Sequence, residues 1–222
     1  MRSPRREPLL RDVAYERLSQ AILTGELPPG EILRYQDLAA QLGMSRVPVR
    51  EAITLLASQG LVEVKAQSFT QVAPIDVVRC RQSVPVLCAL RVAAARSAAL
   101  RITPRQVDQL RQISETFGQV LRRAALEGAH SQLMNTGLDA TRQFHAIYVD
   151  VVDNPILTQM ISMVEPYIYR ALRLRYFEAA LIDAPTAAGL REDLLDAFMR
   201  RDPEGAEIST STTFAFLSSI FN

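Results

Sequence analysis

The pattern of apolar and polar side chains between residues 35 and 60 predicts two short helices joined by a tight turn. Gly43 can end the first helix because glycine tolerates a positive φ at low cost. Ser45 can cap the second helix through its side-chain oxygen, and Pro48 falls in the first turn, where its missing N–H is not needed. Apolar residues recur at helical spacing on one face of each helix: Leu38, Ala39 and Leu42, then Ile53, Leu56 and Ala57.

Two arginines, Arg46 and Arg50, stand four residues apart at the start of the second helix, on its exposed side. A helix with such a start can enter a DNA major groove, although an ordinary helical hairpin with solvated arginines has the same spacing. Residues 61–65 and 69–73 then alternate apolar and polar side chains, as short strands do. A hairpin directly after the second helix favours a winged helix-turn-helix.

The rest of the chain is predicted to be helical, and no strand is expected after residue 74. Pro85 and Pro166 fall inside predicted helices, so a kink or break is expected at Pro85 and a kink at Pro166. The fold class is mainly α: an N-terminal winged helix-turn-helix, with three helices and a short β-hairpin wing, followed by an all-α helical bundle. The expected helices outside the helix-turn-helix are 11–24, 77–100, 104–126, 132–152, 155–180, 184–200 and 203–221.

The expected division of the chain is a mobile arm at 1–10, a winged-helix DNA-binding domain at 11–74 and an all-helical domain at 76–222. The arm is rich in proline and arginine. It either contacts DNA phosphates or is a simple disordered tail.

The composition restricts the class of protein but does not identify a function. Of the residues, 48% are hydrophobic and 22% charged, which is typical of a globular protein with a real core. No apolar run approaches the roughly 18 residues that span a bilayer, and no secretory signal begins the chain, so no membrane partner and a cytoplasmic location are expected. Cys80 and Cys88 are too far apart on one helix to form a disulfide. The net charge is only +1, so the case for DNA depends on where the arginines lie.

Four segments, in this order, make residues 10–75 resemble the DNA-binding domain of the GntR family of bacterial transcription regulators: Ile22–Glu31, Asp37–Ala39, Leu42–Ala52 and Gln59–Val62. The resemblance implies a homodimer that reads a short palindromic operator in double-stranded DNA, and a C-terminal domain that senses a small molecule. Arg46 and Arg50 would contact guanine edges or phosphates, and Ser45 with nearby main-chain N–H groups suits phosphate. The full set of candidate DNA-binding residues is Gln36, Ser45, Arg46, Val47, Pro48, Arg50 and Lys65.

The wing departs from the family's usual pattern. Such wings normally carry a glycine near the tip, which residues 65–69 lack. Lys65 is the only charged candidate there, and Phe69 either folds inward or makes an apolar contact with DNA.

The C-terminal half resembles the all-helical (FCD-type) ligand-binding and dimerisation domain of the FadR-like branch of that family. Many members hold a divalent metal there with an aspartate and three histidines. The corresponding positions here are Thr141, His145, Arg191 and Thr213, so one ligand of four remains. His130 falls in a predicted loop. A lone imidazole does not make a metal site, so we expect no tightly bound metal and no cofactor.

In place of a metal, Arg191 offers a permanent cation that can hold a carboxylate. We expect the pocket to bind a small organic acid as effector through Arg191, with Thr141, His145 and Thr213 lining it. Tyr148 and Arg91 are further candidates. The alternative is that Arg191 pairs with Glu192 or Asp193 at the surface and the pocket is closed.

A run of basic and aromatic residues lies in the helix predicted at 155–180. It either contacts nucleic acid or, as we favour, has one solvated face and one face inside the bundle. The run comprises Tyr167, Tyr169, Arg170, Arg173, Arg175 and Tyr176.

The function expected from the sequence is a ligand-responsive transcription regulator. A repressor is one expectation, and the sequence leaves repression and activation both open. The alternative is a winged-helix protein whose bundle only dimerises or binds proteins, without a small-molecule effector. An enzyme is not expected, because the sequence shows no metal quartet, no Cys–His pair, no paired carboxylate motif and no glycine-rich phosphate loop.

Overall fold

The computed structural model describes residues 9–65, 68–128, 131–182 and 184–220, except for the side chains of 131, 173–185 and 220. Two compact units result, one ending at Ile75 and the other beginning at Asp76. Residues 1–8 of the predicted arm lie outside the described residues. Of the two remaining arm residues, Leu9 is the N-cap position of the first helix and Leu10 is its first residue.

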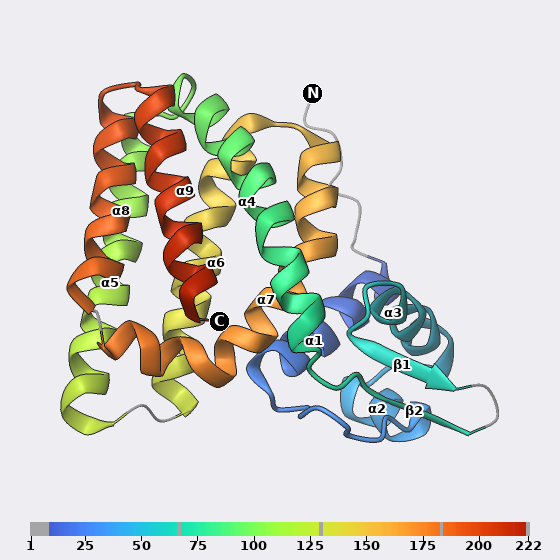
Figure 1. Cartoon of the computed structure of the whole chain (residues 1–222). Coiled ribbons are helices and arrows are strands. Elements are labelled where there is room, and N and C mark those ends of the chain that lie inside the picture. The colour runs from blue at the N-terminus through green and yellow to red at the C-terminus, as the bar shows by residue number, and fades with distance from the viewer. Residues whose placement is uncertain (1–8, 66–67, 129–130, 183, 221–222) are drawn as a thin grey trace. The chain divides into compact units, whose positions relative to one another are not determined.

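The first unit is a three-helix domain with a two-stranded wing, which confirms the predicted fold class (Figure 1). The strands are antiparallel, with Val62 opposite Val72 and Lys65 opposite Phe69. Its elements are α1 (Leu10–Thr24), α2 (Tyr35–Leu42), α3 (Arg46–Ser58), β1 (Val62–Lys65) and β2 (Phe69–Val72).

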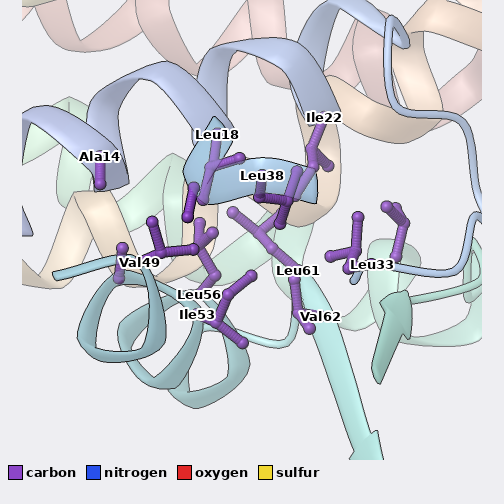
Figure 2. Packing of buried hydrophobic residues seen from close by; sticks show 13 residues of the cluster. Ala14, Leu18, Ile22, Leu33, Leu38, Val49, Ile53, Leu56, Leu61 and Val62 are labelled. Carbon is purple, nitrogen blue, oxygen red and sulfur yellow. The ribbon is translucent and has the colours of Figure 1, made fainter. Parts of the chain in front are cut away.

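A single apolar core holds these elements together (Figure 2). Every element contributes to it, since Leu18 of α1, Leu38 of α2, Ile53 of α3 and Val62 of β1 are all buried. The buried face of α3 is therefore fixed against α1 and α2, and its opposite face is left to solvent. Fully burying one such side chain stabilises a fold by about 1.5–3 kcal/mol.

The turn between α2 and α3 forms as the sequence predicts, except for its cap. Gly43 ends α2 with φ 67°, in the left-handed region that glycine tolerates. Ser45 has the extended backbone of an N-cap residue, but its side chain makes no capping hydrogen bond. This corrects the expectation that Ser45 caps α3 through its hydroxyl. Because the Ser45 hydroxyl is exposed, it can instead form a hydrogen bond with a molecule outside the domain.

In the second unit, every described element is a helix (Figure 1). The helices α4 and α7 continue through Pro85 and Pro166, so α4 is not broken at Pro85. A kink at either proline stays a prediction. Among the described residues no helix has both the length and the apolar character needed to cross a bilayer. The helices are α4 (Val77–Ala99), α5 (Pro104–Glu127), α6 (Ser131–Val152), α7 (Pro155–Ile182), α8 (Ala184–Met199) and α9 (Pro203–Ile220).

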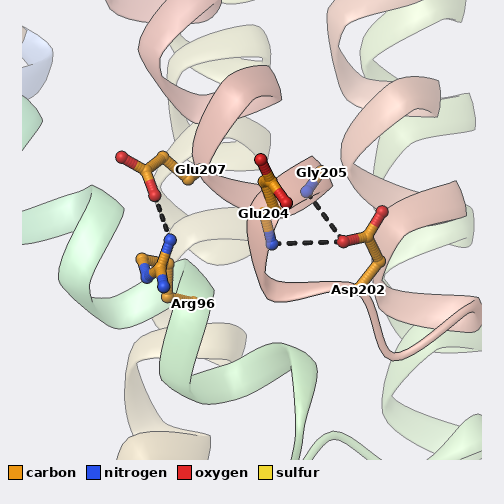
Figure 3. A network of polar contacts seen from close by, with 5 residues as sticks. All are labelled: Arg96, Asp202, Glu204, Gly205 and Glu207. Carbon is orange, nitrogen blue, oxygen red and sulfur yellow. Dashed lines mark hydrogen bonds and ion pairs between the residues drawn. The ribbon is translucent and has the colours of Figure 1, made fainter.

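Side-chain caps define where these helices begin. The Asp76 carboxylate accepts a hydrogen bond from the Arg79 N–H at 3.0 Å, and Thr103 forms a reciprocal capping box with Gln106. At the start of α9, Asp202 Oδ1 accepts from the N–H groups of Glu204 and Gly205 at 3.1 and 2.9 Å (Figure 3). Such caps satisfy N–H groups that have no partner within the helix.

Two polar contacts tie α9 to its neighbours. Arg96 of α4 forms an ion pair with Glu207 (Figure 3). The buried Ser209 hydroxyl donates to the Leu190 carbonyl of α8 at 3.0 Å. The arrangement fixes α9 beside α4 and α8, where it can contribute to a shared interior.

The two cysteines are free thiols. Cys80 is buried, and burial, assisted by the nearby Asp76 carboxylate, raises the pKa of its thiol to about 11. The Cys80 thiol therefore stays protonated and unreactive at neutral pH.

The contact between Gly205 and Asp202 yields a test of the α9 cap. A Cβ added at Gly205 would lie 2.5 Å from Asp202 Oδ2, so alanine there must displace the capping carboxylate. The backbone of Gly205 has no positive φ, and alanine favours a helix over glycine by up to about 1 kcal/mol. Losing the cap costs about 1 kcal/mol. We therefore expect G205A to gain little in the wild-type chain but to stabilise a D202A chain, as measured by urea unfolding.

The control is G189A in α8, where an added Cβ meets nothing within 4 Å. It should stabilise both backgrounds equally. If G205A changes the free energy of unfolding equally in the wild-type and D202A chains, the Asp202 cap is not the reason why alanine is unfavourable at position 205.

Candidate functional site

The exposed start of α3 is the first candidate site. Ser45, Arg46, Val47 and Arg50 are all exposed, Val47 to 53%. Val49 and the rest of the inward stripe are buried, so the exposed side chains project from a helix that cannot rotate. The result is a rigid, positively charged helix start that faces solvent.

Pro48 does not share this exposure. Its side chain is buried with the inward face of α3. The contact of Pro48 with DNA stays a prediction, which its buried side chain does not favour. A proline in the first turn of a helix fixes φ without losing a hydrogen bond, so its contribution is to hold the helix start.

Gln36 and Lys65 are the remaining candidates in the first unit. Gln36 is exposed in the first turn of α2. Lys65 is exposed at the end of β1, with its Nζ 5.1 Å from the centre of the Phe69 ring. Phe69 is half-buried beneath that cation, and residues 66 and 67 of the wing tip lie outside the described residues.

A cavity of about 70 Å³ in the second unit is the other candidate site. Side chains of α4, α6, α7, α8 and α9 line it, and most of them are apolar. Thr141, His145, Arg191 and Thr213 all reach this lining. The structure thus brings together the four positions that the sequence singled out, although they span more than 70 residues.

Arg191 is the dominant charge at the cavity. Its guanidinium lies 3.7 Å from the centre of the Phe117 ring, and Nη2 donates to Thr141 Oγ1 at 2.6 Å. The residue is only 9% exposed, whereas Glu192 and Asp193 are exposed. The alternative in which Arg191 lies at the surface is therefore wrong.

His145 is held neutral beside this cation. Burial is the main cause that lowers its pKa well below the usual 6.5, and repulsion from Arg91 and Arg191 adds to it. Its Nδ1 lies 3.0 Å from the hydroxyl oxygen of Tyr169, which also lines the cavity. Burial, followed by the Glu165 carboxylate, raises the pKa of Tyr169 well above 10, so the phenol keeps its proton.

Arg91 and Tyr148 lie behind the lining rather than in it. Arg91 is buried, and its Nη2 donates to Glu165 Oε1 at 2.8 Å. The Tyr148 ring packs edge-on against His145, with ring centres 5.9 Å apart. These two residues support the cavity wall and do not face the cavity itself.

The basic and aromatic run in α7 is largely inside the bundle where it is described. Tyr169 and Arg170 are buried, and Tyr167 packs under the Arg79 guanidinium at 4.3 Å. The side chains of Arg173, Arg175 and Tyr176 lie outside the described residues.

Sequence reasoning missed three residues that shape the site: Phe117, Glu165 and Tyr169. Phe117 was visible as part of a core stripe, and Tyr169 as part of the basic and aromatic run. A buried cation needs polar or aromatic partners, so a predicted cavity that contains Arg191 was itself a signal that such partners lie near it.

No three His, Cys, Asp or Glu side chains come together as possible metal ligands within the described part of the chain. His130 lies outside the described residues. Oδ1 of the Asp139 carboxylate lies 3.9 Å from Nη1 of Arg142.

Comparisons with known proteins agree with this arrangement of two units. Residues 10–72 match the family described as "Bacterial regulatory proteins, gntR family", and residues 83–214 match the FCD domain. A probable D-xylose utilization operon transcriptional repressor of Paenarthrobacter nicotinovorans is 30% identical over 186 residues, which cover 84% of this chain and 77% of the relative.

Two further proteins are similar over different extents. An uncharacterized HTH-type transcriptional regulator in an unstable DNA locus of Streptomyces ambofaciens is 37% identical over 101 residues, 46% of this chain and 42% of the relative. The solved structure of E. coli McbR/YncC has a TM-score of 0.79 at 23% identity, covering 97% of this chain and 100% of that one. At this sequence identity, the similarity between the two structures shows a shared fold only.

The neutral state of His145 predicts a pH-dependent stability. The unfolded chain binds a proton at this histidine as the pH falls below about 6.5, but the folded chain does not. The free energy of unfolding therefore decreases as the pH falls below about 6.5, with a slope from this group of at most about 1.4 kcal/mol per pH unit. Urea unfolding between pH 7.5 and 5.5 should show a shallower decrease for H145Q than for wild type.

H130Q is the matched control, because it removes the other histidine of the chain. Parallel pH profiles for wild type and H145Q would contradict a neutral His145.

Proposed function

Since the chain belongs to the GntR family and is a transcriptional regulator with an FCD domain, we propose that it is a dimeric repressor released by a small organic acid. It would act in the cytoplasm on a short palindromic operator. The exposed arginines at the start of α3, a helix whose inward face is buried in the core, are the observation that carries this proposal.

The start of α3 suits a major groove. Arg46 and Arg50 can each donate two hydrogen bonds to one guanine edge, a contact worth roughly 1–3 kcal/mol of discrimination against other bases. The exposed Val47 side chain can contact a thymine methyl group. The Ser45 hydroxyl and the first N–H groups of α3 can bind phosphate and fix the position of the helix.

The basic charge of Lys65 would extend this surface through the wing. Lys65 and the Phe69 ring beneath it form one exposed edge of the hairpin. Because the net charge of the chain is only +1, we expect few phosphate contacts from each protomer and a moderate salt dependence.

The cavity favours an effector-binding regulator over a bundle that only dimerises. A purely structural bundle gains nothing from a buried cation, because apolar side chains of similar volume are often as stable or more so. Arg191 at the cavity wall, with Thr141 and His145 close by, suits a carboxylate. Binding would shift the equilibrium between states with different operator affinity, and dimerisation through the bundle would set the spacing of the two half-sites.

The D-xylose operon repressor among the relatives supports repression as the direction of control. A second candidate function, a bundle that serves only as a dimerisation or protein-interaction module, predicts that no small molecule changes operator binding.

Operator binding tests the DNA-reading part of the proposal. A binding sequence can be selected from random double-stranded DNA and measured by fluorescence anisotropy at two salt concentrations. We expect R46A and R50A each to weaken binding by about 1–3 kcal/mol and to relax specificity at one position of each half-site. The matched control is R105A, an exposed arginine in the first turn of α5, which should bind as wild type does.

Selection of no sequence at all, or equal binding by wild type and both α3 variants, would contradict the placement of α3 in the groove. A complex insensitive to salt would point to a partner other than DNA.

A further inference from the structure

We propose that the outer sides of α4 and of the first half of α7 form the surface on which a second copy of this chain docks. The inference rests on the proposed function, because it names the contact that would join the two protomers of the dimer. Residues 82–95 of α4 and residues 155–167 of α7 define this surface, which we call the α4–α7 face. Its charge, its apolar side chains and its size point to the same occupant.

The α4–α7 face carries no unpaired charge. Arg91 is the only charged residue within 82–95, and Glu165 is the only one within 155–167. These two residues pair with each other, since Nη2 of Arg91 donates to Oε1 of Glu165 at 2.8 Å, and Arg91 is buried. The outer sides of both stretches are therefore left without a charge that could interact with water.

A helix of the same unit that faces water has a different pattern. The exposed side of α5 carries Arg105, Asp108 and Glu115, as is usual for a solvated helix face. Contiguous exposed apolar surface is rare in proteins that stay monomeric, and it commonly marks an interaction site. The lack of charge on two neighbouring helices thus indicates a surface that is covered in the assembled protein.

Large apolar side chains follow one another along the outer side of α7. Ile156 is 69% exposed, Met160 43% and Met163 47%, and they recur at spacings of four and three residues. The half-buried Tyr167 continues the row, and its ring centre lies 4.3 Å from the guanidinium carbon of the exposed Arg79 of α4. The row therefore reaches the edge of α4, beside which the first half of α7 runs (Figure 1).

Smaller side chains form the outer side of α4. Pro85, Val86, Ala89 and Ala93 are exposed, Val86 to 50%. Alanines let another helix approach closely, and the flexible methionine side chains of α7 can fill the gaps that remain. The inner sides of both helices are buried in the bundle, so neither helix can turn its outer row inward.

The absence of charge favours a second copy over a different protein. In a two-fold symmetric contact a patch meets itself, so any net charge on the patch would be repelled by its own copy. The α4–α7 face meets its copy without this repulsion. Homodimer interfaces are also more apolar than other interfaces, and methionine is enriched in interfaces. A strongly acidic or basic partner would find no complementary charge on this face.

The size of the α4–α7 face suits a dimer. Each stretch is about 20 Å long at 1.5 Å per residue, and a helix with its side chains is about 10 Å wide. Two adjacent helices thus offer about 400 Å² in flat projection, to which protruding side chains add accessible area. Specific interfaces bury about 800 Å² per partner, so the face supplies an area of the order that a stable dimer needs.

Sedimentation equilibrium of the full chain tests this surface through inserted charges. We expect the wild type to be dimeric at micromolar concentration. M160E and A89E should each raise the dissociation constant of the dimer about a hundredfold or more, because each of the two copies would bury an unpaired charge. The matched control is M199E at a methionine of α8 that is 56% exposed, which should leave the constant unchanged.

Two further measurements keep the test decisive. Far-UV circular dichroism of M160E and A89E should match that of the wild type, because both side chains are exposed. Where a variant does not fold, the wild type alone provides a readout. Its dissociation constant should change less than about threefold between 0.05 and 0.5 M salt, since charge-free surfaces are little affected by screening.

Three results would overturn the inference: a dimer that withstands both M160E and A89E, equal dissociation by M199E, or a wild-type dimer that weakens tenfold or more with salt. A wild type that is monomeric throughout would also overturn it and would leave the face to another partner. A chain that selects an operator and whose dimer withstands both variants refutes this surface alone. Failure to select any operator refutes the proposed function, whatever the mass of the variants.

Discussion

The charge of Arg191 inside the helical unit is the constraint on which the rest of the site depends. A guanidinium does not lose its proton in a protein, so its burial must be offset by neighbouring groups. Phe117 provides the face of an aromatic ring, and Thr141 provides a hydroxyl oxygen. Burial, followed by repulsion from Arg91 and then from Arg191, lowers the pKa of His145 and keeps its ring neutral. Arg191 thus shapes the bonding of its surroundings and contributes to the neutral state of His145.

One turn of α7 connects these groups to α4. Tyr169 lines the cavity and bonds His145, while Glu165 on the same helix pairs with Arg91 of α4. Tyr167, between them, packs under Arg79 in the first turn of α4. Asp76 caps the start of α4 directly after the first unit, so this turn of α7 packs against the helix that follows that unit in the chain. The packing therefore gives the cavity a physical connection to the start of α4.

Local features of the fold could be predicted from the sequence, and distant pairings could not. Gly43, Asp76 and Thr103 mark helix ends through bonds within a few residues, and the structure places helix boundaries at all three. The Ser45 hydroxyl and the buried Pro48 depend on how α3 packs, which periodicity alone does not determine. Arg91 and Glu165 are 74 residues apart, so no spacing rule joins them. The four cavity positions were found through a family resemblance, and Tyr169 and Phe117 required the packed structure.

The arginines of the two units act in opposite physical regimes. Arg46 and Arg50 are surrounded by water and mobile ions, where charges separated by more than about 8–10 Å are largely screened at physiological salt. Any contact that they make with a phosphate would accordingly be sensitive to salt. Arg191 is screened far less, because protein surrounds it. The net charge of +1 therefore says little about either site, because position and burial decide how far the charge of each arginine is screened.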